Sequence, residues 1–179
     1  MTITSCKDVK IEDNFLAQGD FDNLHNIMMT PEFPWFLSGI IDSRADVDKF
    51  QFIHFFYKDC VPTSNWFPIM TPILETLNPL SIWRIKANLL TRTTNIIENT
   101  FHADIGDLSE KKLKQWTTAI LYINTNNGYT KFKDGMKVES VANRMVTFPT
   151  NTEHTGTSCT DEKARVIINF NYFTNDTLL

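Results

Sequence analysis

Three residues of the sequence have the types and spacing of a metal site. His102 and Asp104 are separated by one residue, and His154 follows later in the chain. On a strand, residues i and i+2 point to the same side, so the imidazole of His102 and the carboxylate of Asp104 would lie together. Two histidines and one carboxylate hold one face of an octahedral metal and leave the other face open, which suits Fe(II), whereas zinc more often binds a third histidine or a cysteine. The sequence therefore predicts an Fe(II) site.

A basic residue strengthens this interpretation, because a His-x-Asp pair alone also arises by chance. Arg165 opens the final apolar segment of the chain. A guanidinium that faces a cavity needs an anionic partner to offset its desolvation, and a dicarboxylate ligand would provide one. Without the metal residues, a solvent-exposed Arg165, or one paired with Asp161 or Glu162, would be the simpler interpretation. With them, we favour an anion-binding role for Arg165.

Three segments with alternating polarity are expected to position these residues, namely 82–90, 116–124 and 165–172. In each segment one set of alternate side chains is apolar, as in strands with one face in the core. The opposite faces all carry polar groups, so they can line a small barrel or jelly roll with a ligand cavity. Turn residues at 126–128 and 133–135 predict hairpins between short strands.

The N-terminal part of the chain is expected to support this β region. Residues 30–36 contain two prolines and suit a packed, irregular segment. Residues 49–57 are apolar on both faces, as in a buried strand, which makes His54 a core or pocket-wall residue. Thr71 followed by Pro72 predicts an N-cap and a short helix that ends at Asn78-Pro79.

Length and composition are those of a single soluble domain. The 179 residues include 17 Lys and Arg against 21 Asp and Glu, and the net charge of −4 weighs against a broad electrostatic contact with nucleic acid. No apolar run approaches the roughly 20 residues of a membrane-spanning helix, and the N-terminus lacks the pattern of a secretory signal. We therefore expect a cytoplasmic protein without a membrane partner. Cys6, Cys60 and Cys159 have no metal-ligand spacing, which favours reduced thiols.

A series of short motifs follows in a characteristic order over about residues 82–172. The motifs are His102-Ala-Asp104, Ile120-Leu-Tyr-Ile-Asn124, Gly135 with Lys137-Val138, Arg144-Met-Val-Thr-Phe-Pro149, His154-Thr-Gly156 and Arg165-Val-Ile-Ile-Asn169-Phe. This order resembles the catalytic core of the prolyl 4-hydroxylase-like Fe(II)/2-oxoglutarate-dependent oxygenases. With the preceding Arg84-Ile-Lys-Ala-Asn88, the sequence is most similar to those of small oxygenases of marine bacteriophages.

The resemblance implies a mainly β fold, with a double-stranded β-helix (jelly roll) core, N-terminal helices and a supporting strand. Residues 1–179 would form a single oxygenase domain, in which 1–80 is the supporting segment and 81–173 the catalytic core. The implied Fe(II) ligands and catalytic residues are His102, Asp104 and His154.

The resemblance also implies residues that bind 2-oxoglutarate. Arg165 matches the basic residue that pairs with its distal carboxylate, and Tyr122 matches the tyrosine that supports the same group. Asn88 and Asn169 occupy positions from which a side chain can contact the cosubstrate, although for Asn88 a hydrogen bond to the backbone is an equal alternative. Two neighbours on the same strand face, Arg84 and Lys86, either serve the cosubstrate or form a solvated rim.

The implied activity is that of a hydroxylase that uses Fe(II), 2-oxoglutarate and O2 and releases succinate and CO2. The expected substrate is a peptidyl residue or a small molecule, but the wall at 90–101 lacks the Tyr-x-x-Gly character of peptide-proline hydroxylases, so prolyl specificity does not transfer. The alternatives are a nucleic-acid demethylase or base hydroxylase of the same superfamily, and a non-catalytic, cupin-like metal-binding protein. A phage-encoded enzyme would act in the host cytoplasm.

Overall fold

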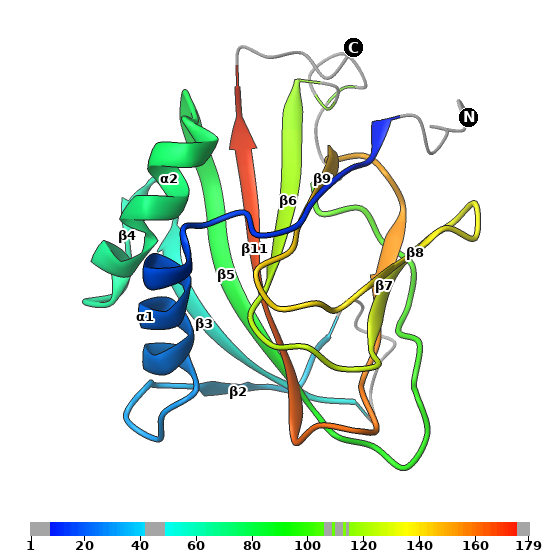
Figure 1. The fold of residues 1–179 in the computed structure, drawn as a ribbon. Coiled ribbons are helices and arrows are strands. Elements are labelled where there is room, and N and C mark those ends of the chain that lie inside the picture. Colours follow the sequence, from blue (N-terminus) through cyan, green and yellow to red (C-terminus); the bar gives the residue numbers. More distant parts are fainter. Residues whose placement is uncertain (1–7, 42–48, 106–108, 110–112, 114, 175–179) are drawn as a thin grey trace.

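Two antiparallel sheets form most of the structure, a computed structural model that describes residues 8–41, 49–105, 109, 113 and 115–174. Along the larger sheet the strand order is β1-β9-β6-β11-β5-β3-β2, with β4 beside β3, and along the smaller sheet it is β10-β7-β8 (Figure 1). The larger sheet contains β1 (Lys10–Glu12), β2 (Phe36–Ser38), β3 (Gln51–Lys58), β4 (Val61–Pro62), β5 (Ser81–Thr91), β6 (Trp116–Tyr122), β9 (Met145–Pro149) and β11 (Ala164–Phe173). The smaller sheet contains β7 (Tyr129–Phe132), β8 (Lys137–Glu139) and β10 (His154–Gly156). The predicted mainly β, jelly-roll architecture is confirmed.

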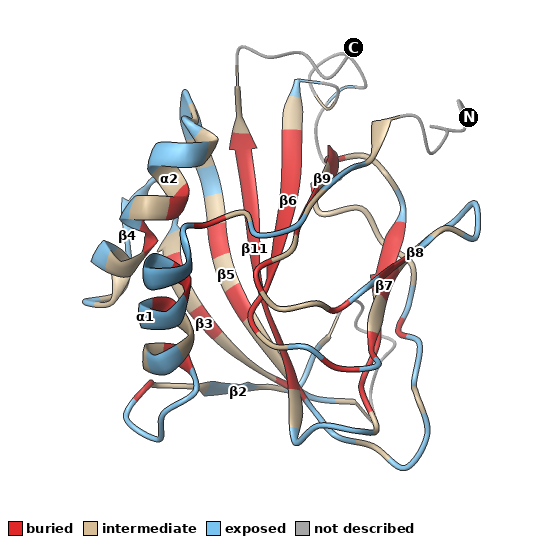
Figure 2. Ribbon diagram, in the orientation of Figure 1, coloured by how far each residue is buried: buried red, intermediate tan, exposed pale blue. Residues whose placement is uncertain are grey.

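Helices cover the outer face of the larger sheet. They are α1 (Gln18–Met28), the 3-10 helix η2 (Phe67–Met70) and α2 (Thr71–Leu77), and α1 and α2 lie beside β3 and β5 in Figure 1. The main core lies beneath them, and the predicted inward faces of β6 and β11 supply much of it through Ala119, Leu121, Ile168 and Phe170. Figure 2 shows these two strands buried along most of their length. The apolar alternation of the sequence thus faces the helices, which leaves the opposite face of the sheet for the site.

A smaller apolar cluster lies on that opposite face. Its members come from both sheets and include Ile120, Tyr122, Phe132, Phe148 and Ile167. Because each strand carries apolar residues here beside polar ones, the space between the sheets is partly sealed and partly polar. A binding pocket can therefore form inside the jelly roll.

One strand departs from the predicted alternation. Trp83 was expected to face the core with Ile85 and Ala87, but its side chain is 49% exposed. Along β11, Asn171 pairs with Arg84 and Tyr172 pairs with Ile82, so Trp83 is the extra residue of a β-bulge. A bulge interrupts the alternation of faces, which explains why Trp83 is turned out of the core.

The short helix α2 ends as predicted but begins differently. Thr71 was expected to be its N-cap, but Met70 holds that position, and Thr71 is the first helical residue. The 3-10 turn of η2 continues directly into α2, so there is no extended residue whose side chain caps the helix. Asn78 adopts the left-handed conformation, with φ 44°, and ends the helix.

Of the two predicted hairpins, only one forms. Residues 133–135 lie in the connection between the paired strands β7 and β8, where Gly135 has a φ of 98°. Residues 126–128 instead carry the chain from β6 in the larger sheet to β7 in the smaller one. Both turns were predicted correctly, but a turn closes a hairpin only where the two flanking strands pair with each other. The strands β6 and β7 belong to different sheets and do not pair.

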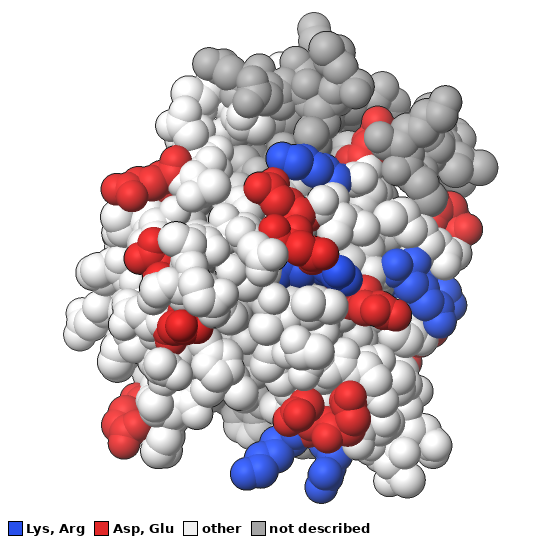
Figure 3. Space-filling view, viewed as in Figure 1, with Lys and Arg blue, Asp and Glu red and all other residues white. Residues whose placement is uncertain are grey.

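Three other findings bear on the sequence predictions. Within the described part of the chain, no helix is long and apolar enough to span a membrane. Cys60 is exposed and Cys159 is buried, both as free thiols, whereas Cys6 lies outside the described residues. Acidic and basic side chains are interspersed on the face of the molecule in Figure 3.

Candidate metal centre and its pocket

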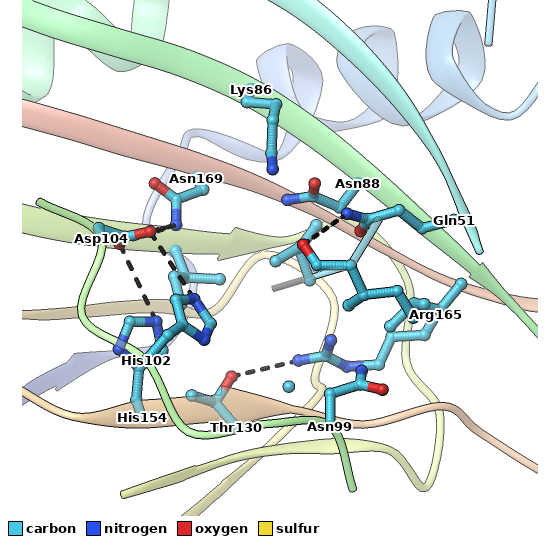
Figure 4. A pocket seen from close by; sticks show the side chains of 15 residues that line it. Gln51, Lys86, Asn88, Asn99, His102, Asp104, Thr130, His154, Arg165 and Asn169 are labelled. Carbon is cyan, nitrogen blue, oxygen red and sulfur yellow. Dashed lines mark hydrogen bonds and ion pairs between the residues drawn. The ribbon is translucent and has the colours of Figure 1, made fainter. Parts of the chain in front are cut away.

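His102, Asp104 and His154 meet between the two sheets. One possible ligand atom from each lies within 4.8 Å of the others. His102 and His154 are joined by an isolated β-bridge with backbone hydrogen bonds of 3.0 and 2.9 Å, which brings the His-x-Asp segment to the start of β10. The Nε2 atom of His102 is 4.0 Å from Oδ1 of Asp104, and that of His154 is 3.9 Å from Oδ2. Figure 4 shows the three side chains converging.

Backbone carbonyls orient both imidazoles. The Nδ1 atom of His102 lies 3.2 Å from the carbonyl oxygen of Thr100, and that of His154 lies 3.0 Å from the carbonyl oxygen of Thr152. A carbonyl can only accept, so each Nδ1 carries a hydrogen, and in the neutral imidazole Nε2 then has the lone pair. Burial lowers the pKa of His154 and so favours its neutral form. This donor set fits a divalent metal ion bound by two neutral imidazoles and a carboxylate.

The carboxylate of Asp104 is surrounded by hydrogen-bond donors. Its Oδ1 accepts from Arg84 at 2.9 Å, and its Oδ2 accepts from Thr118 at 2.9 Å and Asn171 at 3.1 Å. Asn169 donates to both oxygens at 3.3 and 3.1 Å. Burial by itself would raise the pKa of Asp104, but the interactions with His154, Arg84 and Asn169 outweigh it and hold this pKa well below its usual range. The ligand is therefore ionised and fixed in orientation.

A pocket extends from these three residues. Its apolar walls include Leu90, Ile120 and Ile167, and its polar lining comes mainly from the strand faces that the sequence predicted to be polar. The polar lining residues are Gln51, Lys86, Asn88, Asn99, Thr130, Arg165 and Asn169 (Figure 4). The pocket can therefore hold a small polar molecule beside a metal.

Arg165 lies at the other end of this pocket. The side chain is 2% exposed; its Nε donates to the hydroxyl of Ser140 at 2.8 Å and its Nη2 donates to that of Thr130 at 3.1 Å. A Cβ atom at Gly156 would lie 3.3 Å from its Nη1, so the glycine leaves room for the guanidinium. Arg165 is thus not the solvent-exposed strand end of the alternative interpretation, and it presents a cation to the pocket.

Tyr122 is placed differently from the other predicted cosubstrate residues. It does not line the pocket, and its hydroxyl donates to Thr130 at 2.7 Å. Burial raises the pKa of Tyr122, so the phenol remains protonated. Thr130, which the sequence analysis missed, lies between Tyr122 and the pocket. Its position two residues before Phe132 on β7 would have placed it on the inward face of that strand.

Asn88 and Asn169 both line the pocket. The Nδ2 of Asn169 contacts Asp104, and its Oδ1 has no hydrogen-bond partner in the described part of the structure. The same holds for the Oδ1 of Asn88, which argues against the alternative that this oxygen is satisfied by the backbone. Lys86 also faces the pocket, whereas Arg84 contacts Asp104. The two basic residues left open by the sequence therefore have different surroundings.

The segment 92–101 forms a wall by pairing alongside β10. Glu98 forms an isolated bridge with Thr157, and the amide of Asn99 donates to the carbonyl of Gly156 at 3.1 Å. The carboxylate of Glu98 also accepts from the hydroxyl of Tyr129 at 2.7 Å and the ammonium of Lys131 at 2.8 Å. These contacts hold the wall against the smaller sheet, beside the metal residues.

Solved structures share this fold, although no family model and no curated protein sequence matches the chain. The viral collagen prolyl hydroxylase of Paramecium bursaria Chlorella virus-1, in complex with 2-oxoglutarate, matches with a TM-score of 0.61 at 13% identity, over 97% of this chain and 100% of its own. A prolyl hydroxylase from Trichoplax adhaerens, in complex with a hypoxia inducible factor peptide, matches with a TM-score of 0.67 at 10% identity, over 94% and 84%. A 2OG-Fe(II) oxygenase family oxidoreductase from Burkholderia pseudomallei matches with a TM-score of 0.64 at 10% identity, over 93% and 85%. The chain therefore has the fold of prolyl hydroxylase-like 2-oxoglutarate/Fe(II) oxygenases.

Proposed function

We propose that the protein is an Fe(II)- and 2-oxoglutarate-dependent dioxygenase that hydroxylates a C–H bond while 2-oxoglutarate is converted to succinate and CO2. The observation that carries this proposal is the arrangement of one pocket: two imidazoles and a carboxylate at one end, and the buried cation Arg165 at the other. A metal and a dicarboxylate are the ligands that these two ends select by their chemistry.

His102, Asp104 and His154 would hold the metal through the two Nε2 atoms and the carboxylate. When bound, Fe(II) supplies the oxygen chemistry that amino-acid side chains lack. The protein contributes position: three ligands on one side of the metal leave the pocket side for cosubstrate and O2. The carbonyls of Thr100 and Thr152 keep both Nε2 lone pairs available by holding the hydrogen on Nδ1.

Arg165 would bind the distal carboxylate of 2-oxoglutarate. Its guanidinium is held in place by Ser140 and Thr130, so little side-chain freedom is lost when an anion binds. The Oγ1 of Thr130 accepts from both Tyr122 and Arg165, so its own hydrogen is available to a further acceptor in the pocket. Tyr122 would thus act on the carboxylate through Thr130. The apolar side chains of Leu90, Ile120 and Ile167 would exclude water from the carbon chain of 2-oxoglutarate, between the metal residues and Arg165.

For the substrate we propose a peptidyl residue or a small molecule. Two buried amide oxygens that have no hydrogen-bond partner among the described residues, those of Asn88 and Asn169, support a polar ligand with N–H or O–H groups. The net charge of −4 and the interspersed charges of Figure 3 do not favour a nucleic-acid strand as the substrate.

The test is an anaerobic titration of metal-free protein, first with Fe(II) and then with 2-oxoglutarate. We expect the weak visible charge-transfer band of a chelated 2-oxo acid, followed by succinate formation when O2 is admitted. The variant Asp104→Ala should form neither the band nor succinate while keeping the circular dichroism spectrum of the parent protein. Fe(II) binding without such a band in the parent protein would contradict the proposed function.

A further inference from the structure

Arg84, Asp104 and Asn171 form a closed ring of hydrogen bonds. Arg84 donates from Nη2 to Oδ1 of Asp104 at 2.9 Å and from Nε to Oδ1 of Asn171 at 3.0 Å. Asn171 donates from Nδ2 to Oδ2 of Asp104 at 3.1 Å. The bond from Arg84 thus fixes which end of the Asn171 amide faces the carboxylate, and each residue holds a different carboxylate oxygen.

The regular pairing of β5 with β11 makes this ring possible, and the β-bulge at Trp83 begins just beyond it. Arg84 lies directly opposite Asn171 on the neighbouring strand, in the same register that pairs Ile85 with Phe170, and both side chains lie on the pocket side of the sheet. The indole ring of Trp83 packs against that of Trp116, with 5.9 Å between the ring centroids. The bulge turns Trp83 out of the core, whereas Arg84 keeps the alternation that also places Lys86 on the pocket side of the sheet.

The two oxygens of Asp104 are not equally engaged. Oδ2 accepts from Thr118, Asn169 and Asn171 at 2.9 to 3.1 Å, which occupies its lone pairs. Oδ1 accepts from Arg84 at 2.9 Å and has a longer contact of 3.3 Å with Asn169. A carboxylate that chelates a metal needs a lone pair from each oxygen, and Oδ1, with fewer donors and one of them at 3.3 Å, is the oxygen better able to offer one. The hydrogen bonds therefore favour a single metal–oxygen bond.

We infer that Arg84 is a positioning residue that, by holding the Asn171 amide on Oδ2, makes Asp104 bind its metal through Oδ1 alone. This inference rests on the proposed function only in that Asp104 is a metal ligand. A second bond from Asp104 would occupy a position that 2-oxoglutarate or O2 needs, because these ligands must share the open side of the metal. Arg84 thereby keeps that side free. The arginine fork is required because one side chain must reach both Asp104 and Asn171, which the single ammonium of lysine does not do in this geometry.

The experiment measures metal binding to the full chain with Co(II), whose visible absorption reports coordination number. Arg84→Met is the test, and Arg84→Lys keeps the charge without the fork. Arg144→Met is the matched control, because Arg144 also pairs with an aspartate, Asp13, but contacts none of the three metal residues. Circular dichroism and thermal unfolding show whether each variant is folded. Since the Arg84 side chain is 23% exposed, we expect Arg84→Met to fold.

We expect Arg84→Met to weaken Co(II) binding about tenfold or more, as loss of an outer partner of a metal ligand commonly does. Its Co(II) spectrum should also change, Arg84→Lys should show a changed spectrum with a smaller loss of affinity, and Arg144→Met should match the parent protein. A parent-like spectrum and affinity in Arg84→Met would overturn the inference, and so would full rescue of the spectrum by lysine. The Co(II) spectrum and affinity are measured without 2-oxoglutarate. If the parent protein binds Co(II) but does not bind 2-oxoglutarate, the proposed function is contradicted. The Arg84 variants then still decide the role of Arg84.

Discussion

Gly128 lies directly against the side chain of Arg165. A Cβ atom at Gly128 would come within 2.7 Å of Cδ of Arg165 and within 2.7 Å of the backbone oxygen of Ser158. Contacts this short require atoms to move, and the backbone of Ser158 is held by its hydrogen bond to Ile97 at 3.1 Å. The glycine is therefore needed for close packing behind the guanidinium. Its presence in an Asn-Asn-Gly turn concealed this reason.

Gly128→Ala should displace Arg165 and weaken 2-oxoglutarate binding. We expect about a tenfold loss of affinity, together with a decrease of about 1–3 kcal/mol in the free energy of unfolding, as for other substitutions that overpack a core. Anaerobic titration and chemical denaturation measure the two effects. Gly39→Ala is the control, because a Cβ at Gly39 meets nothing within 4 Å. Parent-like 2-oxoglutarate affinity in Gly128→Ala would show that Arg165 does not need its present position.

Arg165→Leu should separate the two ends of the pocket. Charge-assisted hydrogen bonds contribute about 1.5–3 kcal/mol each, so losing the guanidinium should weaken 2-oxoglutarate binding about a hundredfold. Fe(II) affinity should stay within about twofold of the parent value, because Arg165 contacts Ser140 and Thr130 and not the metal residues. Isothermal titration under anaerobic conditions measures both. Equal weakening of the two ligands would indicate general disruption instead.

Thr130 and Tyr122 should contribute unequally to the affinity for 2-oxoglutarate. Thr130→Val keeps the shape of the side chain but removes the hydroxyl that faces the pocket, so we expect about a tenfold loss of 2-oxoglutarate affinity. Tyr122→Phe removes only the group behind that hydroxyl and should cause a smaller loss. The same titration ranks the two variants. If Tyr122→Phe had the larger effect, direct contact between Tyr122 and the cosubstrate would be favoured over contact through Thr130.

His54 should make the metal-free protein less stable in mild acid. Its Nδ1 lies 2.8 Å from the carbonyl oxygen of Pro34 and its Nε2 lies 2.7 Å from the hydroxyl of Ser64, and burial lowers its pKa below the usual 6.5. As the pH falls through 6.5, the unfolded chain takes up a proton that folded His54 does not, so the free energy of unfolding decreases. Above pH 6.5 both states are neutral and this contribution vanishes.

The variant His54→Phe tests this pH dependence. It should lower the free energy of unfolding by about 1–3 kcal/mol at neutral pH through the lost hydrogen bonds. Its stability should then fall less than that of the parent protein between about pH 7.5 and pH 5.5. Denaturant unfolding at both pH values supplies the comparison, and comparing the two proteins cancels the contribution of His154, whose pKa burial also lowers. An identical pH dependence in both proteins would contradict the assignment to His54.

Much of the fold followed from local patterns in the sequence. The strand alternation placed Ile168 and Phe170 in the core and Arg165, Asn169 and Asn171 on the opposite face, as the structure shows. This succeeds because the side-chain direction along a strand has a fixed period of two residues. Where the period is interrupted, as at the bulge of Trp83, the pattern gave the wrong face.

Residue type and spacing were enough to predict the metal ligands, but not the side chains that contact and orient them. His102 and Asp104 belong to one short segment, so their proximity is local, whereas Thr118 and Asn171 reach Asp104 from other strands of the larger sheet. Sequence order carries little information about which strands become neighbours. The sequence therefore indicated the ligands and missed most of the groups that orient them.

What the sequence by itself determined is the set of chemical groups: two imidazoles, one carboxylate and one guanidinium on strands with a polar face. What only the tertiary structure decided is how they are held: Arg84 on Asp104, Thr130 between Tyr122 and the pocket, and Gly128 behind Arg165. The physical reason is the difference in sequence distance over which the two kinds of interaction act. Residue type and strand period act over a few neighbouring residues, but hydrogen bonds and packing across strands depend on register, which the whole sheet sets cooperatively.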